Sequence, residues 1–502
     1  MNDAQGLGIR KASAFLASLT VVGALVGFAY DSLVVVAIGL GKVTDAYFLA
    51  LGVISFVPTL FYLTATNVIT PVLASSDQIS PETRNAARLW WVGFSVALGI
   101  SVALFRTPLS VILSNDESVQ LQLKQCLLVL AGVPLWSALS EFRRAQLLSV
   151  GTYQATGLYG LARNLGMGVA ALWLRPRTAA GLGACVEIGY IVQTIVVQLF
   201  RHADFAPEGR SASTLDLRRT LVRGLISQGA IFGVAYIPTL VERGVAARLG
   251  PGLPTIFSYS YRIVSMLGSV AITSATIPAV AQLARDLVER GGSTLSSTLR
   301  HVFDAATRLA VPAALVLCAV ALPAGRYMAP KQSNEFALIL GLYGLSLVGW
   351  TYLRPWVTLE FARGASRAVL LVTAGQALGA IVVSMGGLAL GSAVLALGPL
   401  CGATVAVLLA RSLARVEDRP SLRAGIALRP AWLLGWLFAA SCGAIGGGAV
   451  MVWRIDRTGA LVANLMAVAL TGCVAWLLSL EKGHAILHQE EPSASSTPGA
   501  MP

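Results

Sequence analysis

Apolar runs of about 20 residues recur along nearly the whole length of this 502-residue chain. Each run is long enough to cross the ~30 Å hydrocarbon core of a bilayer as a helix. Hydrophobic residues make up 56% of the sequence and charged residues 12%, whereas charged residues reach about 25% in soluble globular proteins. Because the first run is long and closely followed by a second, it predicts a retained helix rather than a signal peptide. The sequence therefore predicts an all-α polytopic membrane protein.

Segmentation of these runs predicts about fourteen transmembrane helices, with both termini on one side of the membrane. Five of the predicted spans are 46–74, 121–140, 152–174, 181–200 and 221–241. Most of the 37 Lys and Arg residues then fall in loops on the side of the termini, which the positive-inside rule places in the cytoplasm. We therefore attribute the net charge of +13 to topology and contact with anionic membrane lipids, and not to nucleic-acid binding.

Cysteine, histidine and motif patterns argue against a metal site, a cofactor and an enzymatic function. The six cysteines lie inside predicted spans without a C-x-x-C pair, and the four histidines lack ligand spacing. We find no P-loop, no Gly-rich nucleotide loop and no Ser/His/Asp arrangement. Without an ATP site, transport would depend on an ion gradient, the membrane potential or consumption of the product.

A weak internal repeat predicts two six-helix lobes. Gly41 and Gly250 each close a Leu-Gly turn, and Pro71 and Pro278 end the apolar stretches that follow. Such repeats are a common plan of transporters, with the substrate site at the repeat interface; chance similarity between Ala/Leu/Val-rich helices is the alternative. The predicted division of the chain is a first lobe in 1–200, a cytoplasmic linker in 201–220, a second lobe in 221–411, a linker with two further helices (432–453 and 459–480) in 412–482, and a disordered tail in 483–502.

A short turn between the first two apolar runs carries a family resemblance. Residues 39–48 read Gly-Leu-Gly-Lys-Val-Thr-Asp-Ala-Tyr-Phe, and the following run ends on Thr-Pro-Val-Leu-Ala at 70–74. This arrangement resembles the first two helices of the MurJ/MviN family, whose members flip lipid-linked glycans and belong to the MATE-like MOP exporter superfamily.

The resemblance implies a flippase that carries a polyprenyl-pyrophosphate-linked glycan across the bacterial cytoplasmic membrane by alternating access. The head group would ride between two pseudo-symmetric lobes while the polyprenyl tail stays in lipid. The cargo would be a lipid II-like peptidoglycan precursor or an exopolysaccharide or O-antigen repeat unit. A polysaccharide synthase or polymerase is a possible partner.

Two arginines inside predicted spans are candidate ligands of the pyrophosphate. Arg262 lies in the eighth span, where an arginine costs about 2.5–3.5 kcal/mol on insertion scales and is expected to face the protein interior or a polar cavity. A planar guanidinium suits bidentate binding of phosphate, and the family has an arginine at this place. Arg354, followed by Pro355, lies deep in the tenth span, where the family often has a basic residue. The alternatives are snorkelling to the nearby interface or a structural ion pair for Arg262, and a structural helix kink for Arg354.

Further polar residues inside the predicted spans are candidates for binding, gating or coupling. Arg163 and Asn164 in the fifth span are assigned to substrate binding, since the family has an asparagine there. Glu187 in the sixth span is either a proton or cation site or the ion-pair partner of Arg163.

Two acidic residues bracket the first turn and match acids of the family. Asp31 lies inside an apolar run and needs a partner, so we assign it to gating. Asp45 follows the turn and could also serve simply to cap the second helix.

Departures from the family affect the predicted cargo. Lipid II flippases carry arginines in the first helix and early in the second, whereas the aligned residues here are Ala24, Tyr30 and Gly52. This loss of cations favours a related lipid-linked glycan over lipid II itself. Two other functional classes stay open: a MATE-like ion-coupled exporter of drugs or cations, and a non-transporting scaffold of polysaccharide assembly.

Overall fold

The computed structural model describes residues 3–70, 81–149, 154–200, 214–268, 295–362 and 365–413. These residues are almost entirely helical and include no strand, as the sequence predicts. Eight helices within them are long and apolar enough to cross a membrane. Two shorter apolar helices, Val22–Ile38 and Ala313–Met328, accompany them. The predicted helices at 432–453 and 459–480 and the tail from 483 lie outside the described residues.

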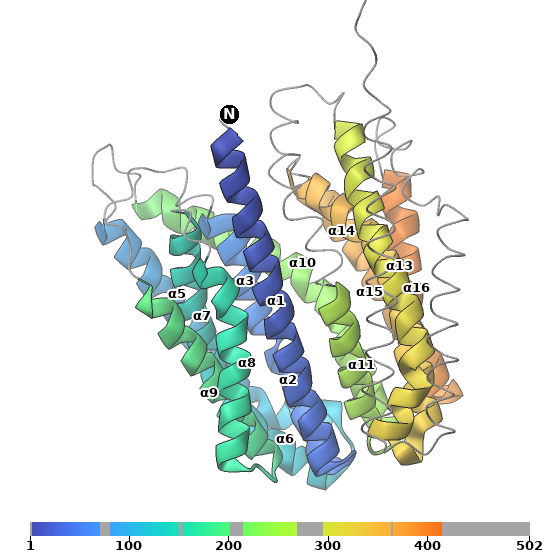
Figure 1. The fold of residues 1–502 in the computed structure, drawn as a ribbon. Coiled ribbons are helices and arrows are strands. Elements are labelled where there is room, and N and C mark those ends of the chain that lie inside the picture. Colours follow the sequence, from blue (N-terminus) through green and yellow to red (C-terminus); the bar gives the residue numbers. More distant parts are fainter. Residues whose placement is uncertain are drawn as a thin grey trace, which may run out of the picture.

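The described helices form two groups with a pair of helices between them (Figure 1). The first group comprises α1 (Asp3–Ile38), α2 (Lys42–Ile54), α3 (Phe56–Thr64), the π-helix η1 (Ala65–Ile69), α5 (Pro81–Leu113), α6 (Glu117–Val129), the 3-10 turn η2 (Leu130–Gly132), α7 (Val133–Ser149), α8 (Gln154–Leu174) and α9 (Ala179–Leu199). The second group comprises α13 (Leu295–Met328), the 3-10 turn η4 (Pro330–Gln332), α14 (Ser333–Ala362), α15 (Ser366–Leu390) and α16 (Ser392–Leu413).

Two helices connect these groups. The first, α10 (Thr214–Leu249), packs on α3 and α5 of the first group and on α15 of the second. The second, α11 (Leu253–Gly268), packs on α2 and on α14. Both therefore lie where the two groups meet, and a side chain on either can contact residues that are distant in the sequence.

The outer surface is apolar in a way that suits lipid. Large hydrophobic side chains on α5, α8 and α15, including Leu104, Leu172 and Leu378, are between 65% and 76% exposed. Trp173, at the end of α8, is 82% exposed, as expected for an aromatic side chain at a membrane–water interface. Charged residues such as Glu141 are buried inside instead. The bilayer would cover the apolar faces and leave these polar groups inside the protein.

The second predicted span, 46–74, is divided in the structure. Helix α2 ends at Ile54, α3 begins at Phe56, and the π-helix η1 follows from Ala65. Pro58 lies in the first turn of α3, where its missing N–H costs little. The side chain of Ser55 donates to the carbonyl of Leu51 at 2.5 Å, and so provides this carbonyl with a hydrogen bond where the helix is interrupted. The chain still crosses as one span, Lys42–Thr64.

Two further predicted spans are longer in the structure than hydropathy alone suggested. The span predicted at 121–140 extends over Glu117–Ser149, with η2 between α6 and α7 and Pro134 at the start of α7. Helix α10 begins at Thr214, inside the predicted linker 201–220, and continues to Leu249. The extra turns carry charged residues, and their buried partners are described below.

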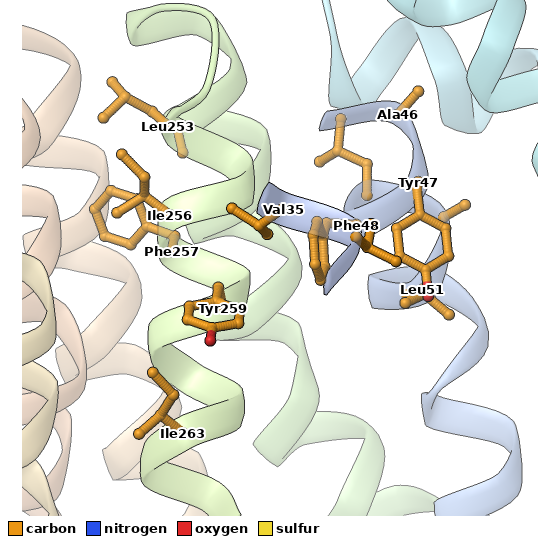
Figure 2. Close-up of a cluster of buried hydrophobic side chains, with 14 of the residues drawn as sticks. Val35, Ala46, Tyr47, Phe48, Leu51, Leu253, Ile256, Phe257, Tyr259 and Ile263 are labelled. Carbon is orange, nitrogen blue, oxygen red and sulfur yellow. The ribbon is translucent and has the colours of Figure 1, made fainter. Parts of the chain in front are cut away.

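An apolar cluster holds α2 against α11. Figure 2 shows Val35 of α1 between Phe48 of α2 and the residues Ile256 and Tyr259 of α11. Leu51 of α2 belongs to the same cluster. All of these side chains are at most 4% exposed. The cluster fixes the relative position of two helices that each carry a predicted site residue, Asp45 on α2 and Arg262 on α11.

Candidate functional site

The centre of the candidate site is an ion pair between α1 and α11. A guanidinium nitrogen of Arg262, Nη1, donates to Asp31 Oδ2. The side chain of Asp31 is 8% exposed and that of Arg262 is 31% exposed. The other carboxylate oxygen, Oδ1, is buried and accepts no hydrogen bond among the described residues. Sequence reasoning predicted both residues as functional, and the structure brings them together.

Aromatic and hydroxyl groups surround this pair. The guanidinium of Arg262 lies 5.8 Å from the ring centroid of Phe48, which is suitable for a cation–π contact. Ser32 Oγ and the hydroxyl oxygen of Tyr259 are 2.6 Å apart and form a second polar link between α1 and α11. The pair is therefore held in a largely apolar setting, where each remaining polar atom must find a partner or a ligand.

Asp45 binds the start of α11 and not the start of its own helix. Its Oδ2 accepts the backbone N–H of Gly252 at 2.7 Å. Its Oδ1 accepts the backbone N–H of Thr255 at 3.2 Å and the Thr255 hydroxyl at 2.6 Å. At the start of α2 the side chain of Thr44 instead accepts the N–H of Gly41 at 3.0 Å. The interpretation of Asp45 as a cap of the second helix was therefore wrong, because this carboxylate caps a helix from another part of the chain.

The turns that precede α2 and α11 meet at the same end of the molecule. Gly252 has a φ of +87°, which favours glycine. A Cβ atom at this position would lie 3.3 Å from Leu40 Cβ and 2.8 Å from Gln332 Oε1. The close approach explains why a glycine is needed where the two turns and the start of α14 come together.

Arg163 and Asn164 lie on α8, behind the Asp31–Arg262 pair. Arg163 donates to the hydroxyl of Tyr190 and to Asn164 Oδ1, each at 3.3 Å. Asn164 Nδ2 donates to the carbonyl of Gly23 in α1 at 2.6 Å. The charge of Arg163 acts electrostatically on both Asp31 and Arg262 without a hydrogen bond to either. These two residues thus support α1 and add positive charge near the pair.

Glu187 on α9 is separate from this arrangement. Its carboxylate lies against Gly132 in η2, where an added Cβ would collide with Oε1. Its Oε2 is buried and accepts no hydrogen bond among the described residues. Both Glu187 and Arg163 are described, and they form no ion pair with each other. The structural alternative of an Arg163–Glu187 pair is therefore wrong.

Arg354 lies on α14 next to Pro355 and is exposed. It forms no ion pair with another described residue. Its charge reaches the hydroxyl of Tyr261 on α11, the neighbour of Arg262 in sequence. The structure thus places Arg354 across α11 from the Asp31–Arg262 pair and in no direct contact with it.

Sequence reasoning missed several buried charged residues, among them two neighbouring or near-neighbouring pairs. Glu141 and Arg144 on α7 form an ion pair at 2.7 Å inside the first group. Glu242 on α10 accepts the hydroxyl of Tyr343, and its neighbour Arg243 is 6% exposed. The available signal was a continuing helical pattern beyond residues 140 and 241, where hydropathy alone ended the spans. Within the described residues, no group of three or more His, Cys, Asp and Glu side chains could hold a metal ion.

The helical fold resembles that of solved MurJ and MATE structures. A structure titled lipid II flippase MurJ, inward closed conformation, aligns with a TM-score of 0.70 and 15% identity over 93% of this chain and 99% of that chain. An outward-facing multidrug resistance MATE transporter of the MOP superfamily aligns with a TM-score of 0.63 and 14% identity over 83% of this chain and 96% of that chain. A MOP superfamily transporter from Pyrococcus furiosus aligns with a TM-score of 0.62 and 12% identity over 86% of this chain and 96% of that chain.

The sequence itself defines the family. The family described as lipid II flippase MurJ matches residues 34–465 of this chain. The chain therefore belongs to the MurJ lipid II flippase family, whose members are membrane flippases of the cell envelope and not catalytic enzymes. Compared with curated proteins, the chain has no significant sequence match. The resemblance read from residues 39–48 and 70–74 is confirmed.

Proposed function

We propose that this protein moves a polyprenyl-pyrophosphate-linked glycan across the cytoplasmic membrane by alternating access. The observation that carries the proposal is the Asp31–Arg262 pair at the contact of α1 and α11. Its guanidinium is partly exposed, and one oxygen of its carboxylate lacks a hydrogen bond among the described residues. An ion pair with a purely structural role would be expected to have a buried guanidinium and hydrogen bonds to both carboxylate oxygens.

The first step is exchange of partners at Arg262. A pyrophosphate offers several oxygens to one guanidinium, and bidentate contacts of this kind are stronger than hydrogen bonds between neutral groups. The anion would thus compete with Asp31 for Arg262 and weaken the contact between α1 and α11. Arg354 would hold the second phosphate from the α14 side, and Arg163 and Asn164 would add positive charge and fix α1.

The second step is release of a gate at the turns. Asp45 holds the N-terminus of α11 with three hydrogen bonds, and the positive end of the helix dipole adds to this attraction. The contact links helices that belong to the two repeats. We assign it as the gate that closes the end of the molecule at the 39–41 and 250–252 turns, which opens when the two lobes rock apart.

The wider plan follows from the same repeats. α2 and α11 each start directly after a glycine, Gly41 and Gly252, and they pack against each other. This supports two pseudo-symmetric lobes, in 1–200 and 221–411, within a protein of about fourteen helices with cytoplasmic termini. Helices in 412–482 would guide the lipid tail, and a polysaccharide synthase or polymerase would use the product.

Glu187 is the candidate for coupling to an ion. One of its oxygens is buried and accepts no hydrogen bond from the part of the chain that the structure describes, and ionisable groups at such places in transporters often exchange protons or cations. A MATE-like exporter of cations is the second candidate function, because this acid is the feature that such a transporter would need. Efflux of cationic dyes that disappears in Glu187→Gln would favour it.

Transport of a defined glycan lipid tests the main proposal. The protein is reconstituted in vesicles with lipid II or with a polyprenyl-pyrophosphate oligosaccharide, and movement of the head group to the other leaflet is measured. We expect transport by the wild type, loss in Arg262→Glu, and partial activity in Arg262→Lys, which keeps the charge but not the planar fork. Arg248→Gln on exposed α10 surface serves as the control.

Two outcomes would contradict the proposal. Full transport by correctly inserted Arg262→Glu would show that Arg262 is not needed to bind the substrate. No transport of either glycan lipid by wild-type protein would reject the function itself. Rescue of bacteria depleted of their own lipid II flippase decides between the two cargoes: growth identifies lipid II as a competent cargo, and failure of well-inserted protein points to another glycan.

A further inference from the structure

The inference starts from a buried arginine that the site described above does not use. Arg243 lies on α10 and is 6% exposed. Among the described residues it makes no ion pair and no hydrogen bond, and its closest recorded contacts are the ring of Tyr261, at 5.9 Å from the centroid, and the backbone of Gly52. Glu242, its neighbour on α10, interacts with it electrostatically but forms no direct ion pair. A buried guanidinium without a direct ion pair or hydrogen bond is unfavourable, so such a residue can gain a partner in another state or bind a ligand.

The position of Arg243 depends on a glycine of α2. A Cβ atom at Gly52 would collide with Nη1 of Arg243, so any other residue there would displace the guanidinium. Tyr236, two turns earlier on α10, donates its hydroxyl to the carbonyl of Gly52 at 2.5 Å. The absence of a side chain at position 52 thus creates the space that Arg243 fills from the other side of the interface.

Other charges lie near Arg243, and they are mostly positive. The hydroxyl of Tyr261 interacts electrostatically with both Arg243 and Arg354, and that of Tyr236 with both Arg243 and Arg262. The nearest acid is Glu242 on the same helix, which accepts the hydroxyl of Tyr343 on α14 and does not pair with Arg243. The charges of three arginines therefore act on these two tyrosine hydroxyls, on α10 and α11, both of which pack on α2.

We propose that Arg243 is a specificity-determining residue that binds the diphosphate of the lipid substrate, in the place left free by Gly52. The proposal rests on the function proposed above and adds one residue to it. A monophosphate can be bound by Arg262 with Arg354, whereas a diphosphate carries further anionic oxygens that a third guanidinium can bind. In the conformation described here α2 covers Arg243. Separation of α2 from α10 uncovers it for the anion.

Binding of two lipids that differ by one phosphate tests this role. The full-length protein is placed in lipid nanodiscs and titrated with a polyprenyl diphosphate and with the polyprenyl monophosphate of the same chain length. We expect the wild type to prefer the diphosphate. Arg243→Gln should weaken diphosphate binding by about tenfold or more, as expected for one charge-assisted contact, with little change for the monophosphate. Arg248→Gln on the same helix is the matched control.

A swap of side chains separates ligand binding from a structural role. Gly52→Arg alone should impair the protein, since two guanidinium groups would compete for one space. Gly52→Arg combined with Arg243→Gly moves the guanidinium from α10 to α2 and should restore the preference for diphosphate. A purely structural Arg243 would give no such recovery selective for the diphosphate. Thermal unfolding and size-exclusion profiles of each variant confirm that it is folded.

The possible failures can be told apart. Unchanged diphosphate preference in folded Arg243→Gln overturns the inference, and it leaves the proposed function intact if the same variant still transports the glycan lipid. Wild-type protein that transports a glycan lipid but binds both probes equally also overturns the inference alone. Wild-type protein that neither transports a glycan lipid nor binds the diphosphate overturns both.

Discussion

Two arginine–carboxylate pairs inside this protein have the same chemistry and different surroundings. The Glu141–Arg144 pair lies within the first helix group, where both side chains are at most 2% exposed. Arg144 also donates to Thr66 Oγ1 at 2.7 Å, and Tyr159 donates to Glu141. The Asp31–Arg262 pair joins α1 to α11, and there the arginine is 31% exposed and Asp31 Oδ1 accepts no hydrogen bond among the described residues.

We infer from this difference that the Glu141–Arg144 pair is structural and that the Asp31–Arg262 pair serves the proposed function. At Glu141 and Arg144, hydrogen bonds and the ring of Tyr62, 4.3 Å from the guanidinium, satisfy the charges completely. Such a network fixes α7 against the π-helix η1, and separating these helices would break its hydrogen bonds. The Asp31–Arg262 pair is incompletely satisfied, and in the proposed function the partly exposed guanidinium of Arg262 can bind an incoming anion.

The largest expected effect is loss of stability when the saturated pair is broken. Arg144→Met leaves Glu141 buried without its counter-charge, which typically costs about 3–5 kcal/mol. We expect a strongly reduced yield and thermal unfolding temperature. The double variant Glu141→Gln with Arg144→Met should recover part of that loss, because no unpaired charge remains. Equal stability of the wild type and the single variant would remove the distinction between the two pairs.

A matched pair of carboxylate-to-amide changes sharpens the comparison. Asp31→Asn should cost about 1–2 kcal/mol of stability, less than Glu141→Gln, because water can reach Arg262. Its main effect should be on glycan-lipid transport, whereas Glu141→Gln should reduce the amount of folded protein and leave transport per folded molecule nearly unchanged. Transport rates normalised to inserted protein measure both. The reverse pattern would contradict the assignment of functions.

A reversible covalent link tests the gate at Asp45. In a background without native cysteines, Asp45→Cys with Thr255→Cys replaces side chains whose oxygens are 2.6 Å apart. The oxidised form should lose transport because α2 and α11 cannot separate, and reduction should restore it. The single variant Asp45→Asn should weaken the closed state by about 1 kcal/mol. If the oxidised protein transports as fast as the protein with reduced cysteines, the contact between Asp45 and Thr255 is not a gate.

The predictable part of the site is the identity of its charged residues. Arg262 and Asp31 were identifiable because a charge inside an apolar span requires a partner or a function. Their pairing was not, since 231 positions separate them in the chain and only the folded interface joins them. Asp45 looked like a local cap by position, but tertiary structure directs it to α11.

The fold was predictable where apolar runs are uninterrupted, and helix ends were not. Helices α8 and α9 begin and end within two residues of the predicted spans 152–174 and 181–200. Predicted spans 121–140 and 221–241 stopped immediately before Glu141 and Glu242, since hydropathy treats a charge as the start of a loop. Both helices continue because buried tyrosine and arginine partners satisfy those charges, which a single sequence does not reveal.

The smallest effect is expected for the exposed ion pair between Lys42 and Asp116. It completes the comparison of a buried, a partly exposed and an exposed ion pair. Lys42 Nζ lies 2.8 Å from Asp116 Oδ2, with side chains 53% and 42% exposed. Lys42 and the hydroxyl of Ser118 lower the pKa of Asp116 below its ordinary value of 3.8. Because the folded-state pKa is lowered, the contribution to stability is present above that ordinary value and is lost as pH falls further. Lys42→Gln should therefore lower the unfolding temperature by only a small amount between about pH 5 and 8, because the contribution is present there but surface pairs contribute little. It should lower the unfolding temperature only at low salt, since screening removes such attractions at high ionic strength. A large loss at neutral pH and high salt would mean that the turn before α2 is held by this pair, and that exposure does not rank the charged contacts of this protein.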